Sequence, residues 1–125
     1  MESQNQQRKS TGFLIKQRAF LKIYLITYIE QNQSYGMQLL DDIKSRFDGD
    51  GYKPQHSEIY RALHELLEDG VLTRGKIVKE GSKYQEVAVY HIGDKEKVNA
   101  YKKLIKHDLE RCISILQKAV KDNFP

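Results

Sequence analysis

The sequence predicts an α+β protein in which three helices are followed by a two-stranded hairpin and a long last helix. Apolar residues recur at helical spacing up to about residue 70, and two runs rich in β-branched residues then flank the sequence KEGSK. A helical pattern returns after these runs and continues almost to the end of the chain. A length of 125 residues suits one domain with a modest core.

The first helix is expected over residues 13–30, where Ser10 or Thr11 can cap it and the high apolar content suits a central core helix. The second is expected over YGMQLLDDIKSRF, and DGDG at residues 48–51 ends it. Four apolar residues at spacings of 3-3-4 are expected to form the buried face of this second helix: Met37, Leu40, Ile43 and Phe47.

The third helix is expected over HSEIYRALHELLED, at residues 56–69. Gly70 then supplies the positive φ of a C-terminal cap. VLTRGKIVK and YQEVAVYHI follow as the strands of a hairpin, because a loop that contains glycine separates them. The apolar stripe of the third helix is about 100° wide and consists of Ile59, Leu63, Leu66 and Leu67.

The last helix is expected over residues 94–121, with Asp94 as its cap. At 1.5 Å per residue it would reach about 42 Å, which exceeds the span of the small core that precedes it. Part of its apolar seam would then lie beyond the domain, and a second copy of the chain is the simplest cover. The alternative is a helix folded wholly back on its own core. The seam and expected dimer contact comprises Val98, Tyr101, Ile105, Leu109, Cys112, Leu116 and Ala119.

This order of elements is that of a winged helix, in which three helices carry a β-hairpin wing, with a long C-terminal dimerisation helix added. The chain is accordingly divided into three parts. A flexible basic arm is expected at residues 1–9, a winged-helix DNA-binding domain at residues 10–93 and a dimerisation helix at residues 94–125.

The composition favours a cytoplasmic protein with no membrane partner. No apolar run approaches the roughly 20 residues of a membrane span, and the opening MESQNQQRKSTG lacks the apolar core of a secretion signal. The single cysteine, Cys112, cannot form an internal disulfide, which suits a reducing compartment. Because it lies on the apolar seam, Cys112 is expected to be a small buried hydrophobe rather than a nucleophile.

The sequence carries no recognisable catalytic constellation. There is no Gly-rich phosphate loop and no serine, histidine and acid set with a nucleophile elbow. We therefore expect no enzymatic activity, no cofactor and no metal. The residues that zinc favours make no close pairs along the chain: His56, His64, His91, His107 and Cys112.

The exposed face of the third helix suits the major groove of duplex DNA, which admits one helix. Arg61 could donate bidentate hydrogen bonds to O6 and N7 of guanine, which would contribute about 1–3 kcal/mol of discrimination between bases. Any amphipathic helix has a polar face, so this face alone does not distinguish a DNA reader from a solvated helix. Because Glu58, Glu65 and Glu68 repel phosphate, the N-terminal turns should enter the groove while the end at residues 68–69 stays clear of it. The expected recognition residues are Gln55, His56, Ser57, Glu58, Tyr60, Arg61 and His64.

The net charge of +4 is distributed so that basic segments flank this helix. Residues 1–24 carry five Lys/Arg against one Glu, and residues 71–93 carry four against two acidic residues, whereas residues 25–70 are acidic. Basic segments around a groove-reading helix suit phosphate contacts, and about six to eight of them per protomer would make binding steeply salt-dependent. The expected contacts are Arg8, Lys9, Lys16 and Arg18 in the arm and first helix, and Arg74, Lys76, Lys79 and Lys83 in the wing.

Four segments of the chain resemble the bacterial replication terminator family: STGFLIKQRAFLKIY, YKPQHSEIYRALHELLEDGVL, KEGSKYQEVAVY and LERCISILQKAVKDNF. The resemblance covers residues 10–124 in the same order. It implies a nucleoid-associated homodimer, joined through the last helices, that binds double-stranded DNA at terminus sites. Two dimers would fill adjacent half-sites cooperatively and stop forks that arrive from one side.

The resemblance also assigns functional residues. DNA contact maps to Lys16 and Arg18, to residues 55–61 and to the wing cations, although Gly75 interrupts a wing that is richer in lysine in the family. The start of the second helix maps to a contact with the replicative helicase, and it keeps Tyr35. The acidic residue of the family shortly before that tyrosine is replaced here by Asn32.

Two further interpretations remain open from the sequence. Residues 35–72 are similar to PadR-type transcriptional regulators, which share the YG pair and IYRALHELLEDGVL. A repressor of this kind would use the same recognition helix but would occupy promoters. The third interpretation is an adaptor that binds another protein through its helices and does not bind DNA. Partner binding that is insensitive to salt, together with no shift of duplex DNA, would favour it.

Overall fold

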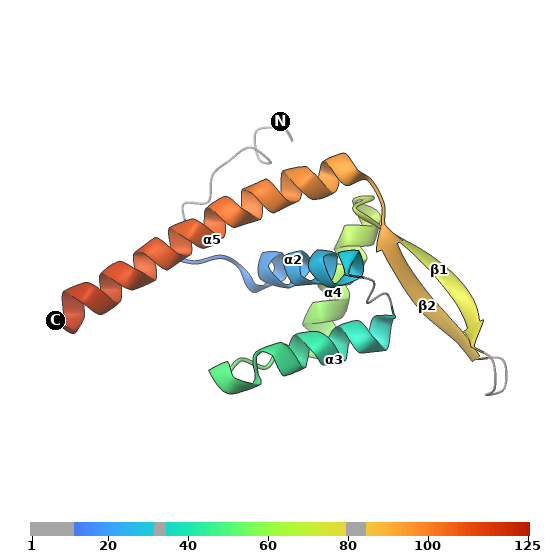
Figure 1. Cartoon of the computed structure of the whole chain (residues 1–125), viewed down its shortest axis with the longest axis horizontal. Coiled ribbons are helices and arrows are strands. Elements are labelled where there is room, and N and C mark those ends of the chain that lie inside the picture. The colour runs from blue at the N-terminus through green and yellow to red at the C-terminus, as the bar shows by residue number, and fades with distance from the viewer. Residues whose placement is uncertain (1–11, 32–34, 80–84) are drawn as a thin grey trace.

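The computed structural model describes residues 12–31, 35–79 and 85–125, apart from the side chains of residues 79 and 85. The described helices and strands follow the predicted order, and Figure 1 shows the helices clustered on one side with the hairpin projecting from them. The winged-helix prediction is therefore confirmed. The elements are α2 (Gln17–Glu30), α3 (Gly36–Arg46), the 3-10 turn η1 (Asp48–Asp50), α4 (His56–Glu68), β1 (Leu72–Lys79), β2 (Gln85–Ile92) and α5 (Lys95–Asn123).

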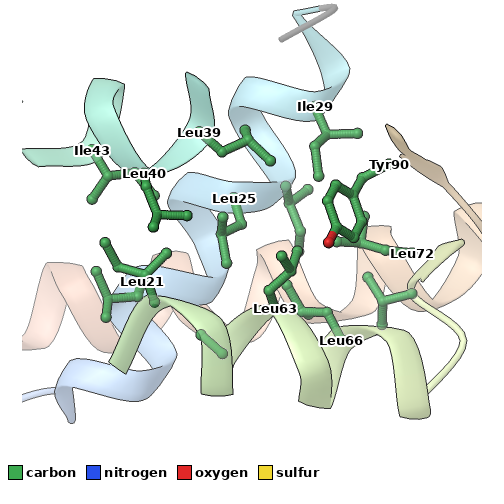
Figure 2. Packing of buried hydrophobic residues seen from close by; sticks show 14 of the residues in the cluster. Leu21, Leu25, Ile29, Leu39, Leu40, Ile43, Leu63, Leu66, Leu72 and Tyr90 are labelled. Atoms are coloured by element: carbon green, nitrogen blue, oxygen red, sulfur yellow. The ribbon is translucent and has the colours of Figure 1, made fainter. Parts of the chain in front are cut away.

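Helix α2 lies at the centre of the molecule, between α5 and α3, and α4 crosses behind it in this view (Figure 1). Its buried side chains meet those of α3, α4 and the base of the hairpin in one hydrophobic core, which Figure 2 shows. The prediction of a central core helix is confirmed. The fully buried larger residues of this core are Leu21, Leu25, Ile26, Leu39, Leu40, Ile43, Ile59, Leu63, Leu66 and Leu72.

The apolar stripe of α4 is buried as its spacing predicts. Ile59, Leu63 and Leu66 are covered, and Leu67 is partly covered at the edge of the core. Gly70 has φ of 76°, in the left-handed region, so the helix ends where the sequence indicates. This burial fixes the rotation of α4 and points its polar face to solvent.

The wing is an antiparallel hairpin in which Leu72 pairs with Ile92 and Lys79 with Gln85. Tyr35, just before α3, forms an isolated antiparallel bridge to Val89 of β2. The bridge ties the start of α3 to the outer edge of β2, so the wing leaves the body at a fixed place.

Helix α5 begins as predicted and runs past the other helices (Figure 1). The Asp94 carboxylate accepts hydrogen bonds from the backbone N–H groups of Glu96 at 2.9 Å and Lys97 at 3.3 Å. The protein's own core covers Val98, Ile105 and Cys112. Beyond Cys112, three large apolar side chains of α5 are exposed, namely Ile113, Leu116 and Val120, whereas Ile115 is half-buried.

Two local expectations were wrong. The first helix begins at Gln17 rather than at residue 13, because the preceding backbone bonds to α5 instead. The Ile15 N–H donates to Cys112 Sγ at 3.2 Å, and the Arg111 guanidinium donates to the carbonyl oxygen of Gly12 at 2.9 Å. These bonds keep the segment from adopting the helical turn that would precede Gln17.

On α3, Met37 is 63% exposed, while Leu39 is buried in its place. Six residues advance a helix by about 600°, which falls 120° short of two turns. Met37 therefore lies well off the face that carries Ile43, although the 3-3-4 spacing suggested one face.

Candidate nucleic-acid interface

The polar face of α4 is on the surface. Its first turn follows extended backbone at Gln55, which has φ of −80° and ψ of 149°. Glu58 differs from the rest of the expected recognition set because it turns toward α2 and is half-buried. The remaining recognition residues are all exposed: Gln55, His56, Ser57, Tyr60, Arg61 and His64.

One flank of this face is formed by cations of α2. Arg18 donates from Nη2 to Glu58 Oε2 at 3.3 Å and from Nη1 to Glu65 Oε2 in a short contact. Lys22 Nζ lies 2.6 Å from Glu65 Oε1. Arg18, expected as a phosphate contact, is thus engaged with two carboxylates of α4, and these ion pairs join the two helices beside the recognition face.

The electrostatic consequence is clearest at Glu65. The hydrogen bond from Lys22 lowers the pKa of Glu65 below its ordinary value, and Arg18 adds to this effect. A lowered pKa of a carboxyl group means that the folded state favours its ionised form. The corresponding stabilisation is present at neutral pH and is lost as the pH falls through the lowered pKa.

The wing supplies further cations. Arg74 is exposed on β1, and Lys76 on the same strand lies 3.6 Å from Glu86 of β2. An open depression of about 730 Å³ lies beside α4, and its lining includes Arg18 of α2, Arg61 of α4 and Arg74 of β1. Glu65 and Glu68 of α4 line the same depression.

The C-terminal end of α4 is acidic and engaged within the protein. Glu68 Oε1 lies 2.8 Å from His64 Nε2, and the backbone carbonyl of Asp69 accepts a hydrogen bond from Lys97 Nζ at 2.9 Å. The acidic end therefore lies at the junction with α5, away from the N-terminal turns that carry Gln55 and Ser57.

Aromatic residues hold the approach to α4 in place. Tyr52 donates a hydrogen bond to Gln17 Oε1 at 2.7 Å, and its ring packs against Phe20 and Phe47. Burial raises the pKa of Tyr52, which further favours the neutral phenol that donates this hydrogen bond. The turn before α4 is thereby tied to the first turn of α2, next to Lys16 and Arg18.

The other expected contacts are placed only in part. Lys16 is exposed at the start of α2, and Tyr35, expected to meet the helicase, is 43% exposed at the start of α3. Five expectations lie outside the residues or side chains that the structure describes: Arg8, Lys9, Asn32, Lys83 and the side chain of Lys79.

Sequence reasoning missed Lys22 and Glu65 as members of this site. Arg18 and Lys22 are four residues apart on α2, and Glu58 and Glu65 are seven apart on α4. Each spacing puts two like charges on one side of a helix. Two such pairs of opposite sign are a signal that the helices pack with these sides together.

Within the described residues, no group of three or more His, Cys, Asp or Glu side chains could hold a metal ion. No helix in the same part of the chain combines the length and apolar character needed to cross a membrane.

Comparisons with known proteins identify the family. Residues 12–124 match the sequence model of the replication terminator protein family. The replication termination protein of Bacillus subtilis is 52% identical over 119 residues, which cover 95% of this chain and 98% of that protein. A match of this length leaves no part of the winged helix or of α5 outside it.

Solved structures give the fold independently. A proposed transcriptional regulator from Thermoplasma acidophilum is 25% identical with a TM-score of 0.55, over 84% of this chain and 90% of that one. The circadian clock associated protein Pex from Anabaena has a TM-score of 0.57 at 16% identity, over 91% and 96% of the two chains. The second likeness concerns the fold alone. Because the family match runs almost from end to end and the Bacillus subtilis relative is so similar, the chain belongs to the replication terminator protein family.

Proposed function

We propose that this chain acts as a homodimer that binds double-stranded DNA at replication terminus sites and stops forks arriving from one side. The observation that carries the proposal is the family match over residues 12–124, together with 52% identity to a protein named for replication termination.

DNA binding is supported by the surface around α4. A helix with an exposed polar face suits the major groove, and the cations of α2 and the wing suit phosphate contacts. Arg61 would contact a base edge, while Lys16 and Arg74 would contact phosphates. The acidic end of α4 would stay clear of the DNA, because it lies at the junction with α5.

Dimerisation is supported by the second half of α5. Ile113, Leu116 and Val120 are exposed on a part of the helix that extends beyond the rest of the molecule (Figure 1). Leu109 and Ala119 border this stripe by helix geometry. Since Val98, Ile105 and Cys112 are covered by their own chain, the proposed interface shifts from the predicted seam to its C-terminal half.

Polar arrest requires an asymmetric barrier. Two dimers on adjacent half-sites would present different faces to forks arriving from the two directions. We propose that the replicative helicase meets the start of α3, where Tyr35 is exposed, on the blocking side. The fork would then stop because the barrier dissociates slowly and is contacted directly.

A helicase assay on duplex that carries the bound site tests this proposal. The site is inserted in both orientations, and unwinding is measured at saturating protein. Strong inhibition in one orientation and little in the other is expected. Equal unwinding in both orientations would reject polar arrest. Tyr35→Ala should reduce the inhibition without changing DNA affinity if the helicase contact contributes.

A second candidate function is transcriptional repression, favoured by the 25% identical solved structure of a proposed transcriptional regulator. Both functions use the same DNA-binding surface, so the location of bound sites separates them. Genome-wide occupancy at paired sites near the terminus supports termination, whereas occupancy at promoters supports repression.

A further inference from the structure

We propose that Arg18, Lys22 and Glu65 are positioning residues that set Arg61 for base recognition, through a chain of alternating charges between α2 and α4. The inference rests on the proposed DNA binding and assigns these three residues a role in specificity rather than in direct contact. It differs from the expected role of Arg18 as a phosphate contact.

The chain of charges is continuous. Lys22 Nζ lies 2.6 Å from Glu65 Oε1, and the other oxygen of Glu65 accepts from Arg18. Arg18 in turn donates from its second terminal nitrogen to Glu58 Oε2 at 3.3 Å. The remaining oxygen of Glu58 lies 3.8 Å from Arg61 Nη1. Each carboxylate thus uses its two oxygens on two different cations.

The two end members of this series of ion pairs differ most in exposure. Lys22 is 13% exposed, so its charge is held where water screens it weakly. Arg61, at the other end, is 67% exposed and touches Glu58 only at the limit of an ion pair. Arg18 and Glu65 thus have close partners, whereas Arg61 lies near the Glu58 carboxylate and is otherwise largely exposed.

This arrangement suits recognition of a base by Arg61. A long side chain loses rotamer freedom when it binds, and a carboxylate that restrains it beforehand reduces that cost. Glu58 alone would repel phosphates near the groove, but Arg18 compensates its charge. Arg18 is in turn held in place by Glu65, which Lys22 anchors from α2. Loss of Glu65 should free Arg18 and leave Glu58 without a fixed partner.

The test compares two substitutions that remove the same charge from α4. Glu65→Gln removes the carboxylate that links Lys22 to Arg18. Glu68→Gln removes a carboxylate three residues away that pairs with His64 instead. Affinity is measured for a duplex that the wild-type chain enriches from a randomised library, and for a scrambled duplex of identical base composition. The ratio of the two affinities reports specificity.

We expect Glu65→Gln to lower this ratio about fivefold, within the range that one two-pronged base contact supplies. Glu68→Gln should strengthen binding to both duplexes alike, because it removes a negative charge that is not part of the ion pairs leading to Arg61, and leave the ratio unchanged. Lys22→Gln should behave as Glu65→Gln does. In an Arg61→Ala background, Glu65→Gln should no longer change the ratio, because the side chain that it positions is absent. Thermal unfolding checks that each variant is folded.

The proposal is overturned if Glu65→Gln and Glu68→Gln have equal effects on the ratio, or if the effect of Glu65→Gln persists without Arg61. A wild-type chain that enriches no duplex would instead reject the proposed DNA binding itself. The two failures are therefore distinguishable.

Discussion

Arg61 combines three properties that few residues of this chain share. It lies on the exposed face of α4, its charge is balanced on one side by Glu58, and it borders the depression between α2 and the wing. A guanidinium in this position suits paired hydrogen bonds to guanine. Discrimination between bases should therefore depend on Arg61 more than on the surrounding cations.

Arg61→Ala should cost about 1–3 kcal/mol of discrimination between the enriched duplex and a scrambled one. Competition titration at fixed salt measures this difference. Arg74→Ala is the matched comparison, since it removes an arginine from the wing. It should weaken binding to both duplexes and reduce the slope of affinity against salt by about one ion. Unchanged affinity of Arg61→Ala for both duplexes would remove it from the interface.

Tyr101 gives a prediction in alkaline solution. Burial raises the pKa of Tyr101 to about 12, and the carboxylates of Glu65 and Asp69 add to the shift. The folded state thus favours the neutral phenol. The resulting stabilisation is fully present below the ordinary tyrosine pKa of 10 and is lost as the pH rises through about 12. The free energy of unfolding should therefore fall between these two values.

Absorbance titration of the tyrosines measures this step, and Tyr101→Phe should remove the component near pH 12. Tyr60→Phe, which removes an exposed tyrosine of α4, should leave that component in place. A component near pH 12 that survives in Tyr101→Phe would show that another phenol carries it.

The junction of α4, the hairpin and α5 is closely packed through backbone groups. The Gly93 N–H donates to the Val71 carbonyl at 2.8 Å, and the Asp94 N–H donates to the Gly70 carbonyl at 3.1 Å. A Cβ at position 93 would lie 2.6 Å from the Gly70 oxygen, which real contacts do not reach. The start of α5 is therefore placed by backbone contact that leaves no room for a side chain.

Gly93→Ala should destabilise the fold by about 1–3 kcal/mol, as overpacking generally does. Gly75→Ala is its control, because a Cβ at that strand position would meet nothing within 4 Å. Glycine in a strand costs about 0.5–1 kcal/mol relative to alanine, so Gly75→Ala should stabilise slightly. Chemical denaturation measures the change in the free energy of unfolding relative to the wild type. This change should have opposite signs in the two variants if the contact at Gly93 is as close as the structure shows. Equal stabilities would contradict it.

The buried face and the end of a helix could be predicted where they depend only on the spacing of nearby residues. The stripe of α4 and its end at Gly70 follow from spacing and from the left-handed backbone that glycine favours. The start of α2 was not predictable in this way, since it depends on hydrogen bonds from residues 111 and 112, about a hundred positions along the chain. The residues around the start of α2 do not indicate which distant residues will form hydrogen bonds with them.

The same distinction applies to the candidate site. The exposure of Arg61 and Ser57 follows from the burial of Ile59 and Leu63 on the other side of one helix. The engagement of Arg18 with Glu58 and Glu65 depends instead on how α2 and α4 pack side by side. The spacing of Arg18 and Lys22, and of Glu58 and Glu65, indicates a charged side on each helix, but the individual pairs depend on how the two sides meet.

At the scale of the whole molecule, α5 serves two purposes along one helix. Its first half packs on α2 and contributes to the core, and its second half carries exposed apolar residues beyond the other elements (Figure 1). An apolar stripe of this kind generally marks a protein interface. A dimer formed there would separate two recognition helices by a distance that α5 sets.

Leu116→Glu tests this arrangement, because Leu116 is 47% exposed on the second half of α5. A carboxylate buried without a partner at the interface should cost about 3 kcal/mol or more, which is roughly a hundredfold in dimer affinity. Sedimentation equilibrium should show a shift to monomer. The winged helix should stay folded, because the substituted side chain lies outside the core.

Ser114→Glu provides the control, since it adds the same charge to an exposed position about 160° around the helix from Leu116. It should remain dimeric. Half-site binding by the monomeric Leu116→Glu variant should persist at low salt, whereas cooperative filling of a full terminus site should be lost. If Leu116→Glu sediments as the wild-type protein does, the dimer interface lies elsewhere. A buried carboxylate between two copies of α5 would have weakened the dimer by the amount given above.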